Sequence, residues 1–160
     1  MKQSFAILAV ASLLAGCVAV PTKNVQDSTQ AKTFDPPAAG EARLYIYRNS
    51  SYGAALKKDV WVNGQCVGET VPKMFFVQEV EGDAEHTLST ESEFSPNHLS
   101  LRTEGGKIYF IRQYIKPGLL VGGANLEVVE EEQGKADVMS LAMGIKGKCS
   151  KPSIPLTTSP

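Results

Sequence analysis

The chain has 160 residues, enough for one domain with a buried core. Its 16 lysines and arginines nearly balance its 17 aspartates and glutamates, which gives a formal net charge of -1 at pH 7. This balance excludes a strongly basic nucleic-acid-binding protein, and neither sign of charge is abundant enough to indicate a polyionic partner.

The N-terminus has the pattern of a bacterial signal peptide. Lys2 precedes an apolar run over residues 5–15 (FAILAVASLLA), and small residues follow it. A transmembrane helix needs about 20 apolar residues, so this run is too short to span a bilayer. We therefore predict that residues 1–16 are a signal peptide.

Residues 13–17 (LLAGC) have the form of a lipobox, in which the signal peptide is cut before a cysteine whose thiol carries a lipid. The sequence predicts lipidation of Cys17, and several acyl chains make such an anchor effectively permanent. Enterobacterial lipoproteins, which this terminus resembles, use aspartate at the next position for inner-membrane retention, so Val18 favours the outer membrane. The alternative is an ordinary secretory signal cut before Val20 or Pro21, which leaves a soluble periplasmic protein.

Residues 17–40 are rich in Pro, Thr, Asn, Gln, Ser, Lys and Ala, and their apolar positions do not alternate. This composition predicts a flexible tether with a root-mean-square reach of roughly 25 Å. Such a tether would let the domain stand clear of the lipid headgroups. A short docking sequence within this segment is the alternative.

From residue 41 onward, short segments rich in β-branched and aromatic residues are separated by turns at regular spacing. This pattern predicts an all-β, mainly antiparallel fold, a compact β-sandwich. The first segment, residues 42–48, has apolar groups on both faces and is expected to be a buried strand. The further strands are expected over residues 59–68, 73–80, 85–90, 98–103, 107–116 and 125–130.

The strongest local signal is Asn63-Gly64 between alternating residues. It predicts a two-residue type I′ hairpin, because both turn positions need a positive φ. The period of two then places Trp61 and Cys66 on one face of the hairpin. The predicted pairs are Val62 with Gln65, Trp61 with Cys66, and Val60 with Val67.

Residues 133–143 place four side chains at helical spacing, which predicts one short C-terminal helix at an end of the sheet. Residues 150–160 are rich in Pro, Ser and Thr and are expected to form a disordered tail. The folded domain is therefore predicted to span residues 41–149. The side chains at helical spacing are Ala136, Met139, Ser140 and Met143.

Cys66 and Cys149 remain once lipidation takes Cys17, in a compartment that oxidises thiols. We expect them to form one disulfide, which would tie the end of the domain to the early hairpin. The chain-entropy model assigns a bridge over such a loop about 4 to 5 kcal/mol as an upper figure. The alternative is two buried or terminal thiols that do not meet.

His86 and His98 are the only histidines, and the chain has no HExxH, CxxC, GxSxG, GxGxxG or P-loop motif. The sequence therefore predicts no metal site, no cofactor and no catalytic residue. His86 is expected to hydrogen-bond the turn at Gly82, and His98 to begin a half-exposed strand. The charge run over residues 130–132 (EEE) is expected to be the solvated end of a strand.

Aromatic and arginine side chains supply the candidates for a ligand or partner surface. If Tyr47, Tyr52 and Tyr114 gathered on an exposed face, they would form a platform for a glycan or peptide. A sandwich of this size needs most of its aromatic rings inside, so core positions are favoured. Arg48 or Arg112 could grip a carboxylate-bearing ligand, or pair instead with Glu79 or Glu91.

Four stretches resemble those of a known kind of domain: residues 40–48 (GEARLYIYR), 62–64 (VNG), 82–88 (GDAEHTL) and 106–112 (GKIYFIR). Across residues 41–132 the chain resembles a small lipoprotein domain of unknown function, similar to PEGA-type β-domains of bacterial envelopes. The resemblance implies a compact β-sandwich without an established activity. One departure is Asp83-Ala84-Glu85, which makes the turn before His86 longer than the usual Gly-Xaa-His.

The predicted function is that of a lipid-anchored outer-membrane lipoprotein that faces the periplasm and acts as a non-catalytic binding or structural module. Its expected partners are the membrane, through the lipid on Cys17, and an envelope protein or cell-wall component that meets an exposed sheet edge or aromatic face. One alternative is a cell-wall or small-molecule hydrolase or transferase, whose site would join a histidine to a carboxylate. Another is a surface-exposed lipoprotein that interacts with a host.

Overall fold

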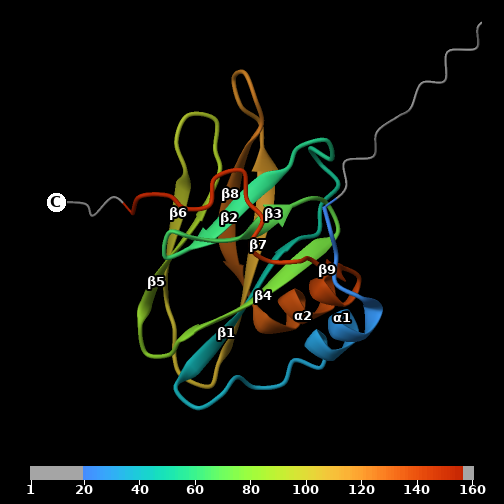
Figure 1. Ribbon diagram of the computed structural model, residues 1–160, viewed down its shortest axis with the longest axis vertical. Helices are drawn as coiled ribbons and strands as arrows, with labels where there is room; N and C mark the ends of the chain where they lie inside the picture. The colour runs from blue at the N-terminus through green and yellow to red at the C-terminus, as the bar shows by residue number, and fades with distance from the viewer. Residues whose placement is uncertain (1–19, 157–160) are drawn as a thin grey trace, which may run out of the picture.

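The computed structural model describes residues 20–156, which form two β-sheets packed together and two short helices (Figure 1). The first sheet has five strands in the order β8-β7-β1-β4-β9, and the second has four in the order β3-β2-β5-β6. The predicted mainly β sandwich with a C-terminal helix is confirmed. The predicted signal peptide and Cys17 lie outside the described residues.

Every strand expected from the sequence is present, with bounds that differ by at most two residues, and the short strand β9 was not expected. Neighbouring strands are antiparallel except for the pairs β1–β7 and β4–β9. The five-stranded sheet contains β1 (Glu41–Arg48), β4 (Met74–Glu81), β7 (Ile108–Lys116), β8 (Gly123–Val129) and β9 (Ala142–Met143). The four-stranded sheet contains β2 (Lys58–Val62), β3 (Gln65–Thr70), β5 (Glu85–Thr90) and β6 (Asn97–Arg102).

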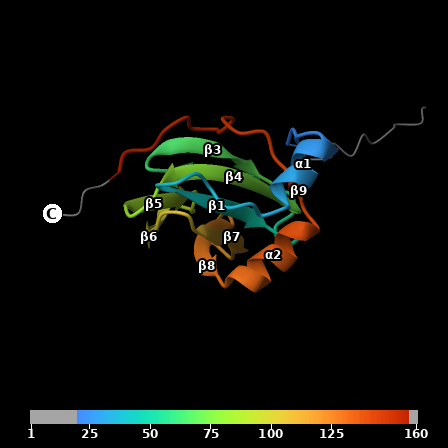
Figure 2. The same cartoon turned by 90° about the horizontal axis from the view of Figure 1, so that it is seen from below.

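The helices are α1 (Val25–Ala31) and α2 (Glu131–Met139). Within residues 20–156, neither has the length and apolar character that a bilayer-spanning helix requires. Both lie near the five-stranded sheet, on the side away from β2, β3, β5 and β6 (Figure 2).

Strand β1 is buried on both faces, as its sequence predicts. Leu44 and Ile46 point between the two sheets and belong to the inner core of the sandwich. Tyr45 and Tyr47 point to the opposite face, where they form a second core with Phe75, Phe110 and two residues of the α2 region. The helices therefore cover the aromatic face of the sheet, and these tyrosines occupy core positions, as the sequence favoured.

The predicted flexible tether is wrong for residues 20–40, the part of it that the structure describes. Asn24 caps α1, because its side chain accepts the N–H of Asp27 at 2.8 Å. Beyond the helix, the ring of Phe34 packs on those of Tyr45 and Phe110, with centroids 5.2 and 5.7 Å away. A helix of seven residues is marginal alone, so this packing, which local composition does not reveal, holds the segment in place.

The type I′ hairpin joins β2 to β3 as predicted, with φ of 50° at Asn63 and 77° at Gly64. The first two predicted pairs are confirmed, and the third is wrong. A register shift after Val60 places Gly68 rather than Val67 opposite it. Such a bulge inserts an extra residue into one strand, and alternation alone does not predict it.

The predicted disordered tail is wrong over residues 150–156. Ile154 is 8% exposed, and its N–H donates to the carbonyl of Gly64 at 3.1 Å. The indole N–H of Trp61 donates to the carbonyl of Lys151 at 2.8 Å. Trp61 therefore lies on the outer face of the four-stranded sheet, beneath the C-terminal segment, while its neighbours in β2 face the inner core.

Helix α2 is shorter than predicted and presents a different face to the sheet. Gly134 and Val138 are its buried residues, whereas Met139 is 57% exposed. The helix ends there because the following residues form β9 beside β4. The charge run of residues 130–132 lies at the start of α2 rather than at a solvated strand end. Carboxylates at the start of a helix are stabilised by the positive end of the helix dipole.

Candidate functional site

Four loops meet at one end of the sandwich, which we call the loop end: residues 49–57, 71–73, 91–96 and 117–122. They join β1 to β2, β3 to β4, β5 to β6 and β7 to β8. Strand β1 runs parallel to β7 and antiparallel to β4, so β1 and β7 end where β4 begins. Strand β2 runs antiparallel to β3 and β5, so β3 and β5 end where β2 begins. The four connections therefore lie at the same end of the sandwich. Figure 1 shows the β5–β6 and β7–β8 loops projecting at the top, with the β1–β2 loop to their right.

The loop end exposes a group of large apolar side chains. Leu119 and Leu120 in the β7–β8 loop are 84% and 80% exposed, and Phe94 in the β5–β6 loop is 78% exposed. Val121 lies beside the leucines and is also exposed. We call these four residues the apolar tip. Exposed large apolar side chains grouped at one end of a domain mark an interaction surface more often than isolated apolar residues do.

The carboxylate of Glu93 holds the apolar tip in one conformation. It accepts the backbone N–H groups of Leu119 at 2.7 Å, of Leu120, and of Val121 at 3.2 Å. Partial desolvation raises the pKa of Glu93, but these three hydrogen bonds outweigh it and hold the pKa below its ordinary value. The tip is therefore an organised loop joined to its neighbour, and it presents its aliphatic side chains outward.

Arg48, a predicted surface candidate, is fully buried at the end of β1. Its guanidinium donates to the carbonyls of Leu56 at 2.7 Å, Tyr52 at 3.1 Å and Gly53 at 2.7 Å. Burial lowers the pKa of Arg48 from its ordinary value. The side chain holds the β1–β2 loop at the loop end, so Arg48 is buried and is not part of an exposed ligand surface.

The other surface candidates do not form one platform. Tyr47 is fully buried, as the sequence favoured for most aromatic side chains, and its hydroxyl donates to Asp137 at 2.7 Å. Arg112 pairs at 2.7 Å with Glu127, not with either of the predicted partners. Tyr114 is half-buried, and its hydroxyl accepts the side-chain N–H of Asn125 at 3.1 Å. Tyr52 alone is well exposed, at 59%, in the β1–β2 loop.

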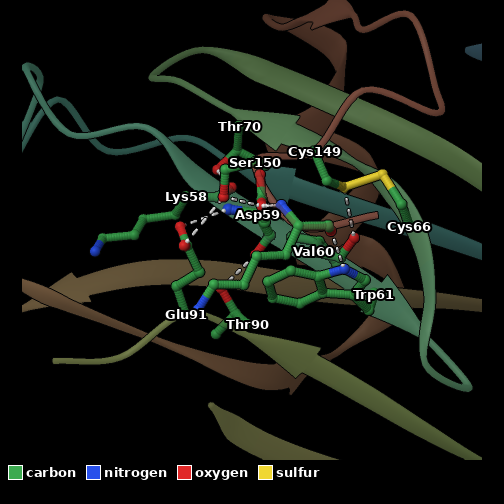
Figure 3. Close-up of a disulfide and its surroundings, with 11 residues drawn as sticks. Lys58, Asp59, Val60, Trp61, Cys66, Thr70, Thr90, Glu91, Cys149 and Ser150 are labelled. Atoms are coloured by element: carbon green, nitrogen blue, oxygen red, sulfur yellow. Dashed lines mark hydrogen bonds between the residues drawn. A yellow bond between two sulfur atoms is a disulfide. The ribbon is translucent and has the colours of Figure 1, made fainter. Parts of the chain in front are cut away.

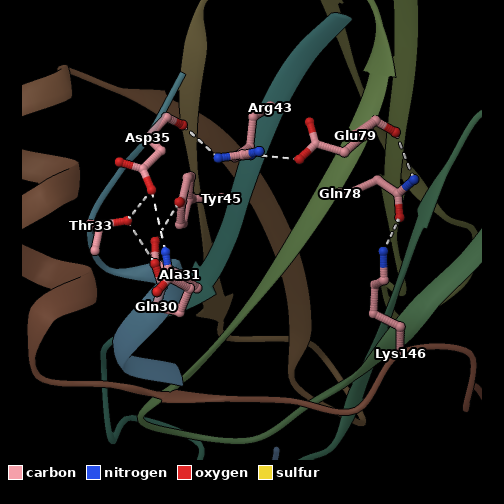
Figure 4. Close-up of polar contacts among 9 residues, drawn as sticks. All are labelled: Gln30, Ala31, Thr33, Asp35, Arg43, Tyr45, Gln78, Glu79 and Lys146. Carbon is pink, nitrogen blue, oxygen red and sulfur yellow. Dashed lines mark hydrogen bonds and ion pairs between the residues drawn. The ribbon is translucent and has the colours of Figure 1, made fainter. Parts of the chain in front are cut away.

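Between α1 and the strands β1 and β4 lies a groove of about 410 Å³. Figure 4 shows Arg43 lying between Asp35 and Glu79; its Nε is 2.5 Å from Glu79 Oε1, and its Nη1 donates to the Asp35 carbonyl. Burial lowers the pKa of Arg43, but the hydrogen bond and charge of Glu79 raise it above its ordinary value. Tyr45 donates to the carbonyl of Ala31 at 2.6 Å. These contacts tie the α1 segment to the sheet.

The predicted disulfide is confirmed: Cys66 in β3 is joined to Cys149, with Cα atoms 6.1 Å apart (Figure 3). Beside it, Asp59 is fully buried in β2 and accepts the N–H of Lys151 at 3.1 Å. The covalent bond and this carboxylate together hold the C-terminal segment over Trp61.

The histidines make local contacts. His86 is buried, and its Nε2 lies 2.8 Å from the carbonyl of Glu81 while its Nδ1 lies 2.9 Å from the side-chain nitrogen of Asn63. It therefore binds the turn after β4, as predicted, at the edge of a cavity of about 370 Å³. His98 is exposed, more than expected, and its Nδ1 lies 2.7 Å from the hydroxyl of Ser89. Among the described residues, no three His, Cys, Asp or Glu side chains are grouped to hold a metal ion.

Sequence reasoning did not identify the apolar tip. The signal was present in residues 117–123 (PGLLVGG), where three aliphatic residues stand between glycines in a predicted turn region. The pattern resembles a strand fragment, and only its exposure in the folded chain distinguishes it from core residues.

Comparison with known proteins places this chain in a family. The model of a family described as "Protein of unknown function (DUF2846)" matches residues 38–124. An uncharacterized protein of Haemophilus influenzae is 49% identical over 148 residues, which cover 91% of this chain and 88% of that protein. No solved structure matches the chain. The expectation of a domain of unknown function is thereby confirmed, and the chain belongs to the DUF2846 family.

Proposed function

We propose that the protein is a lipoprotein of the bacterial outer membrane, anchored by a lipid on Cys17 with its domain on the periplasmic face, and that it acts as a non-catalytic binding or structural module. The lipobox of residues 13–17 supports the anchor. The Cys66–Cys149 disulfide supports an oxidising compartment such as the periplasm. A likeness to PEGA-type β-domains of the envelope belongs to the same proposal.

The observation that carries the proposal is how close the folded domain begins to the lipobox. Val20 packs against the inner core, and it stands three residues after Cys17. An ordinary tether would leave a lipidated domain free to turn in any direction. Here a lipid on Cys17 would hold a rigid domain at the membrane, an arrangement that suits a module presenting one fixed surface.

The non-catalytic role is supported by the contacts of the two histidines. His86 binds a carbonyl and an amide, and His98 binds a hydroxyl. Within residues 20–156, neither imidazole has a carboxylate as a hydrogen-bond partner, so the orienting contact of a general base is not formed there.

Cys17→Ser tests the anchor directly. In a Gram-negative host, we expect the wild-type protein to incorporate labelled palmitate, to fractionate with the outer membrane, and to accumulate as precursor when the lipoprotein peptidase inhibitor globomycin is added. The Cys17→Ser variant should lose the label and leave the membrane fraction, while Cys66→Ser serves as a control that keeps the lipid. A wild-type protein that carries no palmitate and ignores globomycin would contradict the proposal.

The binding role has a separate test. Chemical crosslinking in living cells, followed by mass spectrometry, should yield a specific envelope protein or cell-wall fragment with the wild type and not with the soluble Cys17→Ser variant. Release of soluble fragments when the purified protein is incubated with peptidoglycan, abolished by His86→Ala or His98→Ala, would instead support the hydrolase alternative.

A further inference from the structure

The N-terminal segment enters the folded domain on the half of the molecule that carries the loop end. Lys23 donates its N–H to the carbonyl of Met143 at 2.7 Å, and Met143 pairs with Phe75 at the start of β4. The start of β4 follows directly from the loop of residues 71–73. Figure 1 shows the described chain beginning, in dark blue, below the β1–β2 loop and running down from there to α1.

The chain between the proposed lipid and the domain is short. Three residues span at most about 11 Å when fully extended, so a lipidated Cys17 lies within that distance of Val20. Val20 is itself packed against the inner core. The domain then has no room to stand clear of the bilayer, and the surface next to Val20 must lie close to the headgroups.

From these two observations and the exposed apolar tip, we infer that the loop end rests on the phospholipid surface, with Leu119, Leu120, Val121 and Phe94 inserted among the headgroups beside the lipid anchor. This inference rests on the proposed anchoring through Cys17. Tyr52, which is 59% exposed in the neighbouring β1–β2 loop, lies at the level of the headgroups, where aromatic side chains with a polar end are favoured.

The organisation of the tip fits insertion into lipid. Side chains that project from a loop bury apolar area in an acyl boundary that closes around them. Glu93 satisfies the N–H groups of Leu119, Leu120 and Val121, so these backbone donors need no water when the loop enters the interface. An unpaired N–H would oppose insertion.

A tryptophan at the tip tests the inference in the full lipidated protein. Leu120→Trp is reconstituted into vesicles of phosphatidylethanolamine and phosphatidylglycerol, with and without bromine on the acyl chains. We expect the bromine to quench about half of the added emission, because the side chain lies at the acyl boundary. Trp61, the only native tryptophan, is buried under the C-terminal segment and serves as the subtracted background.

Val128→Trp is the matched control. Val128 is also an exposed aliphatic residue, at 49%, but it lies toward the far end of β8 from the tip. Its emission should be unchanged by bromine. Phe94→Trp is a second reporter at the tip, which keeps the test valid if Leu120→Trp fails to fold, and adding Leu119→Asp to it should remove most of its quenching.

Flotation of the vesicles separates failure of the inference from failure of the proposed function. In one outcome, the protein floats with the vesicles, but Leu120→Trp and Phe94→Trp are quenched no more than Val128→Trp. That result would overturn the inference and leave the proposed anchor in place. The apolar tip would then be free for a protein partner. Wild-type protein that carries no lipid and does not float would overturn both.

Discussion

Arg48 shows how a single residue can be assigned to the wrong role when only its type and position are known. A cation at the end of an aromatic strand can point to solvent and bind a ligand, or point inward and bind the backbone. In the folded chain it is buried, and three carbonyls of the β1–β2 loop accept its hydrogen bonds. Buried charges need such partners, and these come from residues that only the turn of the chain brings near.

Tyr47 provides a prediction at the same scale. Burial, and then its hydrogen bond to Asp137, raise the pKa of Tyr47. A raised pKa in the folded state contributes stability that is fully present below the unfolded pKa of about 10, and this stability is lost as pH rises toward the folded value. We expect the free energy of unfolding of the wild type to fall above about pH 10 more steeply than that of Tyr47→Phe.

Urea unfolding followed from pH 7 to 11 measures this difference. At pH 7, Tyr47→Phe should cost about 1.5 to 3 kcal/mol, the net worth of one hydrogen bond to a carboxylate. Tyr52→Phe is the exposed control and should leave the stability unchanged. Parallel pH profiles for Tyr47→Phe and the wild type would contradict the assignment.

At the scale of elements, the short segments at both ends of the domain are held by contacts with distant strands. The C-terminal segment is joined to β2 and β3 by the disulfide, by Asp59 and by the indole of Trp61. The N-terminal segment is joined to β1 and β7 by Phe34 and to β1 by Arg43. Neither segment has enough local interactions to fold alone.

The double variant Cys66→Ser/Cys149→Ser tests the C-terminal attachment. The bridge closes a loop with a sequence separation of 83, and its loss should lower the free energy of unfolding by about 2 to 4 kcal/mol. The emission of Trp61 should shift to the red because the C-terminal segment no longer covers the indole. Denaturant unfolding with fluorescence measures both effects; Ser100→Ala, at an exposed position in β6, is the control. An unchanged midpoint and emission maximum would show that noncovalent contacts alone hold the segment.

At the scale of the whole molecule, the folded unit is larger than residues 41–149. Removing residues 20–40 would expose Tyr45, Phe75 and Phe110 on the outer face of the five-stranded sheet. Each large apolar side chain left in water costs about 1.5 to 3 kcal/mol, and a domain is stable by only about 5 to 15 kcal/mol.

We therefore expect the fragment of residues 20–156 to unfold at the same temperature as the mature chain, and the fragment of residues 41–149 to be unfolded or to aggregate at 37 °C. Thermal unfolding followed by circular dichroism distinguishes them. A cooperative transition of the shorter fragment at the temperature of the longer one would show that the terminal segments are not part of the folded unit.

The sequence by itself determined the features that depend on neighbouring residues. The alternation of strands, the Asn63-Gly64 hairpin and the short C-terminal helix follow from local backbone preferences, and two remaining cysteines were enough to predict the bridge. The same local character explains the error at Val60, since a bulge changes the register without changing the alternation of apolar residues that predicts a strand.

The tertiary structure decided where the polar terminal segments go, which face of α2 meets the sheet, and which apolar residues stay outside. Phe34 contacts β1 and β7, Gly134 lies against the ring of Phe110, and Leu120 is left exposed at the loop end. Each of these outcomes depends on the free energy of contacts between residues far apart in the chain. Local composition cannot encode such contacts, because the same leucine or phenylalanine is stable in a core or on a surface according to what the fold brings against it.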